Sequence, residues 1–161
     1  MRIVEMSQHE CSELLKRLYI GRLGCALDNQ PHIVPVYFSY EADSIYIFST
    51  VGKKIEWMRQ NPKVCLQADE IVDGLEWLSV IVTGTYLELN VPQYHTSLRE
   101  HAREKLAAQS SEWWRIPLSG ARDRELVSSM ETIFFRIDIK SISGLRAVPE
   151  AEQSVHQGTD H

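Results

Sequence analysis

The sequence lacks the features that would assign it to several common protein classes. Cysteine is rare, with three residues in 161, an odd number at wide spacing, so neither a disulfide framework nor a CxxC zinc site is expected. No apolar run approaches the roughly 18 residues that a membrane helix needs. The N-terminal region has no long apolar segment, so no secretory signal is expected. These absences predict a cytoplasmic protein without a membrane partner.

Basic residues are fewer than acidic ones. The chain has 17 Lys and Arg residues and 22 Asp and Glu residues, which gives a net charge of −5 with neutral histidine. A broad nucleic-acid-binding face needs clustered Lys and Arg, so none is expected. The sequence also has no GxGxxG, GxxxxGK or GxSxG motif, so the usual signatures of dinucleotide, P-loop and hydrolase sites are missing.

The spacing of histidines and carboxylates does not predict a metal site. His95 and His101 are six residues apart, which does not place both on one face of a helix. The acidic residues between Asp69 and Glu76 do not follow the pattern of a calcium loop, and they flank an Asp-Gly hairpin signal. We therefore predict no metal ligands.

Hydrophobic periodicity predicts a mainly β chain with peripheral helices. Ser7 and Glu10 form a capping-box pattern that opens a helix over 7–18, and further helices are predicted at 53–60 and 92–108. Six segments have strand patterns: 20–27, 32–40, 44–48, 63–69, 77–89 and 132–141. Because hairpins join most of them without a regular alternation of strand and helix, a small antiparallel barrel is favoured over a Rossmann sheet.

A single domain accounts for most of the chain. We assign residues 1–146 to it and residues 147–161 to a poorly ordered tail, because the tail has few large apolar residues. The adjacent Trp113 and Trp114 cannot both point inward from one element. One is expected to cover the barrel, and the other is expected to contact a partner subunit or to cap a ligand cleft.

Two local features point to a bound ligand. Pro35 lies inside a predicted strand, where it cannot donate a ladder hydrogen bond, so an edge, a bulge or a neighbour other than a strand is expected there. The segment 52–63 carries four basic side chains and one acid. Its lysine pair, Lys53 and Lys54, stands at a predicted helix start, where unpaired amide groups favour a phosphate. An ordinary solvated lysine pair is the alternative.

Six short runs follow one another in a specific order along the chain: Gly24–Leu27, Pro31–Phe38, Ile45–Thr50, Gly52–Lys54, Asn61–Leu66 and Ser79–Gly84. Together they resemble the pyridoxamine 5′-phosphate oxidase-like flavoproteins, in particular their nitroimidazole-resistance branch. The resemblance covers residues 14–90 and, more loosely, the final strand at 134–144. It implies a six-stranded split β-barrel that forms a homodimer and binds FMN, without a covalent bond, in two clefts between the subunits.

The resemblance also implies which residues hold the cofactor. Lys53 and Lys54 match the basic pair at the FMN phosphate, the strand around Pro35 matches the one along the isoalloxazine, and the strand that starts at Trp77 closes the site. The implied cofactor-binding residues are Val34, Pro35, Val36, Phe48, Ser49, Thr50, Lys53, Lys54, Trp77 and Ser79. No catalytic residue is identified.

The implied activity is that of an FMN-dependent oxidoreductase. Electrons would pass from a reduced nicotinamide, NADH or NADPH, to a small electrophilic or nitro-containing molecule, with the flavin performing the chemistry. FAD and haem are alternative cofactors, and a split barrel that holds flavin or haem without turnover, or a structural dimer with an empty cleft, is an alternative function. True pyridoxamine-phosphate oxidases carry a C-terminal Trp and Arg-Leu signature that this chain lacks, so oxidation of vitamin B6 is not expected.

Overall fold

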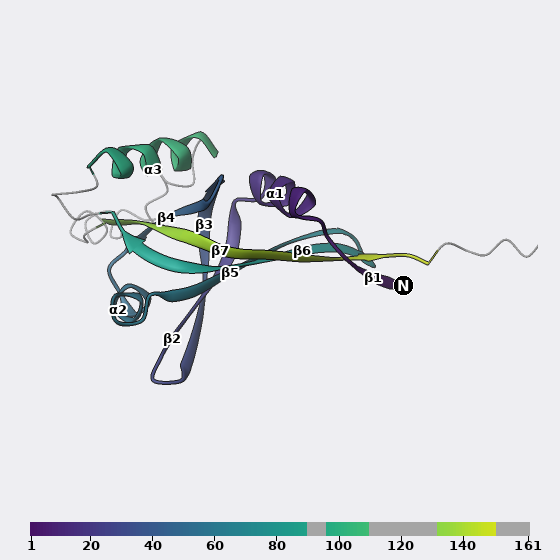
Figure 1. Cartoon of the computed structure of the whole chain (residues 1–161), viewed down its shortest axis with the longest axis horizontal. Coiled ribbons are helices and arrows are strands. Elements are labelled where there is room, and N and C mark those ends of the chain that lie inside the picture. Colours follow the sequence, from purple (N-terminus) through teal and green to yellow (C-terminus); the bar gives the residue numbers. More distant parts are fainter. Residues whose placement is uncertain (90–95, 110–131, 151–161) are drawn as a thin grey trace, which may run out of the picture.

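The computed structural model describes residues 1–89, 96–109 and 132–150 (Figure 1). The strands in this part of the chain are β1 (Arg2–Glu5), β2 (Ile20–Leu27), β3 (Gln30–Glu41), β4 (Ser44–Thr50), β5 (Lys63–Asp73), β6 (Glu76–Glu88) and β7 (Thr132–Val148). The helices are α1 (Gln8–Arg17), α2 (Lys53–Gln60) and α3 (Thr96–Gln109). None of these helices is long and apolar enough to cross a membrane. Trp113 and Trp114 lie outside the described residues.

All strand pairs are antiparallel, and six strands close into a barrel. The hydrogen-bonded order is β7-β4-β3-β2-β5-β6, and β6 pairs with β7 again. β1 lies outside this ring and pairs with β7. The mainly β, antiparallel barrel expected from the sequence is thus confirmed. β1 is a seventh strand that the periodicity missed, because four residues are too few to show an alternating pattern.

The last strand, β7, is longer than the sequence predicts. It pairs with β4 through Asp138 and with β6 from Phe135 to Ala147, while its last four residues pair with β1. Ala147, which is 1% exposed, and Val148 therefore belong to the sheet, although composition placed them in the tail. Local composition could not reveal this, because the partner strand lies at the other end of the chain. In Figure 1 the end of β7, β1 and the start of β6 extend away from the barrel as an arm.

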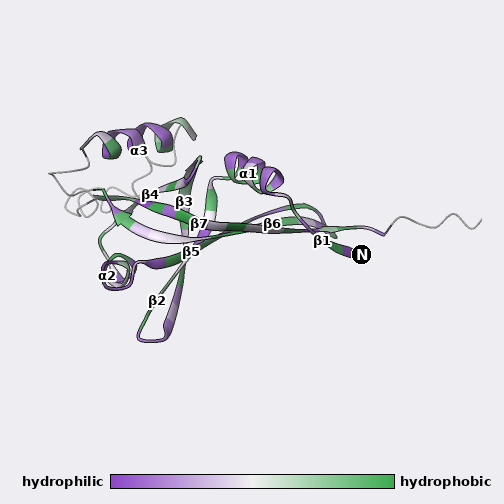
Figure 2. Ribbon diagram, in the orientation of Figure 1, coloured by the Kyte–Doolittle hydropathy of each residue, from purple (hydrophilic) through white to green (hydrophobic). Residues whose placement is uncertain are grey.

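The core lies between the inner sides of the strands and two of the helices. Strand alternation places every second residue inside. The fully buried large side chains include Leu23, Phe38, Ile45, Ile47, Leu66 and Phe135 from the strands, Leu14 and Leu15 from α1, and Ile55 and Met58 from α2. Figure 2 shows that α1 is mainly hydrophilic on the side turned away from the sheet, as expected for a helix that covers a core with one face.

The starts of the helices follow the sequence prediction where they are described. The Glu10 amide donates to Ser7 Oγ (3.2 Å), and the Ser7 amide donates to the Glu10 carboxylate (2.7 Å), so the capping box is confirmed. These hydrogen bonds lower the pKa of Glu10. α2 begins at Lys53 and ends at Gln60, as predicted. The predicted start of the third helix, at residue 92, lies outside the described residues.

A second, smaller apolar cluster holds α3 on the barrel. Its buried members are Tyr46, Leu89, Ala102 and Leu106. Glu41, at the end of β3, forms ion pairs with His101 and with Lys105, the latter at 2.8 Å. The hydrogen bonds from Lys105 and His101 lower the pKa of Glu41. α3 therefore covers the outer side of β4 and leaves the opposite end of β3 uncovered.

Candidate cofactor site

The barrel splits where β3 leaves β2 and joins β4. β3 pairs with β2 along residues 30–37 and with β4 along residues 38–41. Beyond the pair Phe38–Ile47, β3 and β4 no longer pair, while β4 stays paired with β7 as far as Thr50. Two groups of predicted cofactor residues flank this divergence: Val34 to Val36 on β3 and Phe48 to Thr50 on β4. The first half of β3 thus has an edge that no described strand pairs.

The prolines of β3 fit this open edge. The amide of Phe38 donates to the Tyr19 carbonyl on the β2 side (2.9 Å). Hydrogen bonding alternates along an antiparallel pair, so the backbone nitrogens of 31, 33, 35 and 37 face the other side. Pro31 and Pro35 both occupy such positions and remove no bond to β2. Of the three alternatives predicted at Pro35, the described strands show an edge, and the Ile33 amide faces outward.

Lys54 is the cation best placed for an anion. It is the second residue of α2, whose N-cap residue, Gly52, has no side chain to accept from the first amides of the helix. Lys54 is half-buried, and this burial lowers its pKa, an effect that the nearby Cys25 opposes. Within the described part of the chain, no carboxylate forms an ion pair with Lys54. A partly desolvated, uncompensated ammonium beside unpaired helix amides favours a phosphate.

Lys53 differs from its neighbour. Its Nζ lies 4.5 Å from the ring centre of Trp57, one turn further along α2. The same ring packs partly against the core and lies 5.6 Å from the ring of His32 on β3. Lys53 is exposed and already has a cation–π contact. It can contribute charge to the site, but Lys54 is expected to contribute more.

The residues at the end of β4 point in different directions. Ser49 is 8% exposed, and its hydroxyl donates to the Thr50 carbonyl (3.0 Å). Phe48 points to the opposite side, where it packs near Phe134, 6.2 Å between ring centres, in the cluster under α3. Alternation along the strand explains this placement. The side chain of Phe48 thus lies with α3 rather than beside Lys54.

An ion pair that the sequence did not indicate fixes the end of α2. Arg59 donates from Nε (2.9 Å) and Nη2 (2.8 Å) to the two carboxylate oxygens of Glu88 on β6. The Tyr86 hydroxyl donates to the same carboxylate at 2.9 Å. The contact with Arg59 lowers the pKa of Glu88, and burial raises that of Tyr86. Arg59 and Glu88 are far apart in the sequence, so no local pattern predicts this clamp, by which we mean the ion pair that holds the end of α2 on β6.

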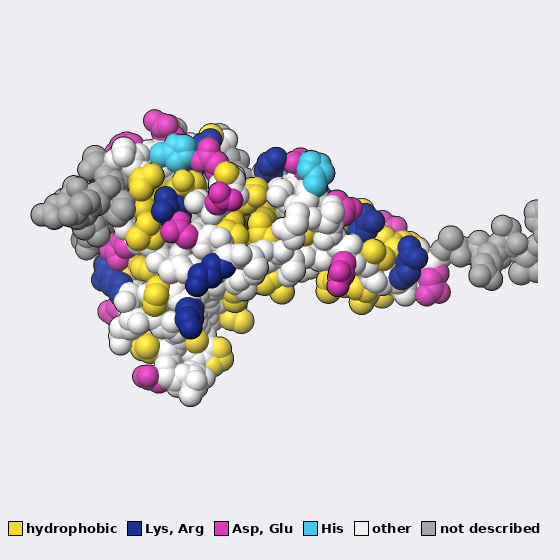
Figure 3. Space-filling view, viewed as in Figure 1, with side chains coloured by type: hydrophobic (Ala, Val, Ile, Leu, Met, Phe, Trp, Pro, Cys, Tyr) yellow, Lys and Arg dark blue, Asp and Glu magenta, His cyan; other side chains and the backbone are white. Residues whose placement is uncertain are grey.

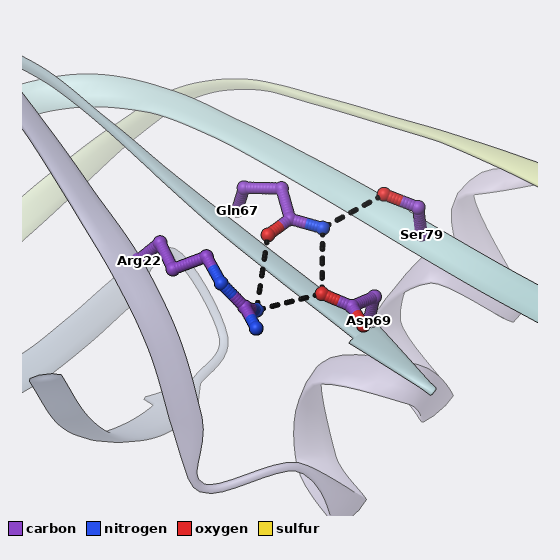
Figure 4. Close-up of polar contacts among 4 residues, drawn as sticks. All are labelled: Arg22, Gln67, Asp69 and Ser79. Carbon is purple, nitrogen blue, oxygen red and sulfur yellow. Dashed lines mark hydrogen bonds and ion pairs between the residues drawn. The ribbon is translucent and has the colours of Figure 1, made fainter. Parts of the chain in front are cut away.

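Ser79 lies on the outer face of the sheet, where a polar network joins three strands (Figure 4), and Trp77, two residues before it on β6, shares that face. Gln67 Nε2 donates to Ser79 Oγ (3.1 Å) and to Asp69 Oδ1 (3.0 Å). Arg22 Nη1 donates to the same Asp69 oxygen at 2.7 Å. Arg22 is also the register partner of Pro35, so this network runs from the start of β6 to the open strand. Sequence patterns did not assign Arg22, Gln67 or Asp69 to the cofactor site.

The predicted residues therefore form two groups on opposite sides of β2 and β3. Lys54, on α2, lies on the inner side, near Cys25 of β2. Trp77 and Ser79 lie on the outer side and reach Pro35 only through the Arg22 network. Among the hollows formed by the described residues, none is lined by all ten.

This geometry defines a split β-barrel with a half-buried lysine near a helix start and a strand edge that no described strand pairs. The chain belongs to the pyridoxamine 5′-phosphate oxidase family, whose model matches residues 7–146. A FAD-binding protein from Mesorhizobium loti, known from its crystal structure, is 40% identical, with 92% of this chain and 100% of that chain covered and a TM-score of 0.75.

Two further relatives extend the comparison. An uncharacterized protein from Rhizobium meliloti (strain 1021) is 36% identical over 142 residues, which are 88% of this chain and 93% of that protein. A candidate 5-nitroimidazole antibiotic resistance protein from Bacteroides thetaiotaomicron is 16% identical and shares the fold, with a TM-score of 0.65 and coverage of 92% and 93%. The family resemblance seen in the sequence is thereby confirmed.

Proposed function

We propose that the protein binds a flavin without a covalent bond, with the phosphate at Lys54 and the ring system along the open edge of β3. The observation that carries this proposal is the half-buried Lys54, which has no ion-pair partner among the described residues and stands at a helix start. The unpaired edge around Pro35 supports it, because a flat ring can use backbone groups there. The FAD-binding relative at 40% identity supports the same class of ligand.

We propose FMN as the flavin. Lys53 and Lys54 provide one compact basic site, which suits a single terminal phosphate. The Mesorhizobium loti relative is described as FAD-binding, and FAD has a phosphate at the same position of its ribityl chain. The flavin released on denaturation distinguishes the two. Release of FMN supports FMN as the cofactor. Release of FAD would make FAD the cofactor and would leave the proposed flavin binding unchanged.

The proposed activity is oxidoreduction in a cytoplasmic homodimer. The bound flavin would supply hydride or electron transfer between NADH or NADPH and a small molecule. The residues of this chain would bind and orient the cofactor: Lys54 at the phosphate, and the backbone of β3 at the ring. Arg59 and Glu88 would keep α2, and with it Lys54, in place.

The test is an absorption spectrum of the protein as purified, followed by chromatography of the released ligand. We expect the visible bands of an oxidised flavin and their bleaching by NADH or NADPH. A colourless protein whose melting temperature does not change on addition of FMN contradicts flavin binding. A Soret band instead would identify the haem alternative. Flavin bands that no nicotinamide bleaches would leave a flavin-binding protein without the proposed electron donor.

A further inference from the structure

A hollow of about 460 Å³ lies on the arm. It is lined by the end of β1 and the start of α1, by the start of β6 and by residues 143–145 of β7. Figure 3 shows hydrophobic side chains along the lower boundary of the arm, next to acidic and basic ones. Trp77, Ile81 and Leu145 supply apolar walls. A hollow of this volume with apolar walls is large enough for a small molecule.

Strand register brings an acid, a hydroxyl group and an indole ring to one face of the arm. Glu5 pairs with Leu145, and Leu145 pairs with Ser79 on its other side. Residues directly opposite each other share a face, so Glu5 and Ser79 stand two strand spacings, about 10 Å, apart. Trp77 precedes Ser79 by two positions and shares this face. A small molecule seated on Leu145 would therefore lie among all three.

The polar groups that line the hollow can accept hydrogen bonds from a ligand. The Glu5 carboxylate is an acceptor when ionised. Gln8 Nε2 donates to the Ile142 carbonyl (2.9 Å), which leaves the amide oxygen of Gln8 as an acceptor. Ser79 Oγ accepts from Gln67 Nε2 (3.1 Å) and keeps a second lone pair. These acceptors favour a ligand that donates hydrogen bonds.

The charges of the arm are separated between its two faces. Among the described residues that line the hollow, the only charged side chain is that of Glu5. Within residues 1–89, 96–109 and 132–150, no basic group forms an ion pair with Glu5. Arg2 and Arg146 occupy the alternate strand positions and so lie on the opposite face. There Arg146 forms an ion pair with Glu10 at 2.8 Å. The negative charge of Glu5 is therefore available to a ligand.

A second hollow adds negative charge on the other side of Trp77. It has a volume of about 360 Å³ and shares Trp77 and Ser79 with the first. Its charged lining residues are Asp69 and Asp73. Asp69 forms an ion pair with Arg22 (2.7 Å), whereas Asp73 forms none in the described part of the chain. Acidic groups on both sides, together with the face of a tryptophan ring, attract a cation.

We propose that the hollow on the arm binds a small organic cation, a protonated amine that carries an apolar group. The ammonium donates to the Glu5 carboxylate and to the amide oxygen of Gln8. Its apolar group packs on Leu145 and against Trp77. This inference goes beyond the proposed function, because Glu5 and Gln8 belong to neither group of predicted cofactor residues and the site does not require a bound flavin.

Calorimetric titration with benzylammonium tests the site on the protein as purified. Benzyl alcohol has a similar shape without the charge, so it should bind at least about 10-fold more weakly. Glu5→Gln should weaken the binding of benzylammonium roughly 5–30-fold, as expected for loss of a charged hydrogen bond. Leu145 is 43% exposed, so Leu145→Lys should fold normally. It places a tethered ammonium beside Glu5 and should abolish binding.

The matched control is Glu13→Gln, which removes a carboxylate of α1 that does not line the hollow. It should bind benzylammonium as the native protein does, and circular dichroism checks that every variant is folded. The proposal is overturned if the native protein does not bind benzylammonium, if benzyl alcohol binds equally well, or if Glu5→Gln and Glu13→Gln have equal affinities. Flavin bands in a protein that binds no amine would leave the proposed function intact. Binding of benzylammonium that depends on Glu5 in a protein without flavin would support this site alone.

Discussion

The two halves of β3 differ in what covers them. Residues 38–41 pair with β4, and helices contact both of their faces: Ser12 Oγ of α1 lies 3.2 Å from the Tyr40 hydroxyl, and Lys105 of α3 binds Glu41. Residues 30–37 pair with β2, and their other edge has no strand partner in the described structure. Phe38 is fully buried, whereas Ile33 is 69% exposed. We therefore expect the second half to contribute more to stability, and the first half is the part left open for the proposed ligand.

The largest expected difference between the halves is in the free energy of unfolding. Phe38→Ala removes a fully buried ring and should cost about 3–5 kcal/mol. Ile33→Ala should change stability by less than about 0.5 kcal/mol in the monomer, because the side chain is exposed. Urea denaturation of both variants in the absence of ligand measures this contrast. Equal losses would show that the two halves contribute alike to stability.

The clamp on α2 should have a smaller, pH-dependent effect. Glu88→Gln keeps the size of the side chain but weakens the bonds from Arg59 and Tyr86, at a cost of roughly 1–2 kcal/mol at pH 7. The folded-state pKa of Glu88 is lowered from its ordinary value of 4.5, so its stabilisation is present above that value and is lost as the pH falls below it.

Thermal unfolding at several pH values tests this sign. The native protein should melt at a higher temperature than Glu88→Gln at pH 7, and the difference should shrink below pH 4.5. A matched control is Glu13→Gln, which alters an exposed ion pair on α1 and should change stability little. A difference that grows in acid would contradict the assigned role of Glu88.

The smallest effect is expected at the open edge itself. Pro35→Ala restores an amide that faces away from β2, so no ladder bond is gained and stability should change by less than about 0.5 kcal/mol. Pro at position 36 should behave differently, because the Val36 nitrogen faces β2. Val36→Pro is expected to cost about 3 kcal/mol. If Pro35→Ala instead stabilises the chain strongly, the edge is paired and the interpretation of this half is wrong.

Local patterns predicted most of the fold. The capping box of α1, the start of α2 at Lys53 and the six barrel strands follow from periodicity and from turn residues. The pairing of β1 with the end of β7 did not, because register between distant segments depends on tertiary contacts. For the same reason, composition did not predict that β7 continues through Ala147 and Val148.

The candidate site was predicted in part. A charge pattern at a helix start identified Lys53 and Lys54, but only the fold shows that Lys54 is half-buried while Lys53 contacts Trp57. Strand alternation alone could have placed Phe48 on the side of α3. The Arg59–Glu88 clamp and the network of Arg22 and Asp69 join distant segments, so no spacing rule could have found them.

A titration with FMN tests the central claim most directly. Flavin-free native protein, Lys54→Ala and the control Lys16→Ala, which removes an exposed lysine on α1, are compared by flavin fluorescence, with melting temperatures to confirm folding. We predict that the native protein and Lys16→Ala bind alike and that Lys54→Ala binds roughly 10–100-fold more weakly, as expected for loss of a charged hydrogen bond. Unchanged affinity in a folded Lys54→Ala would contradict the assignment of the flavin phosphate to the start of α2.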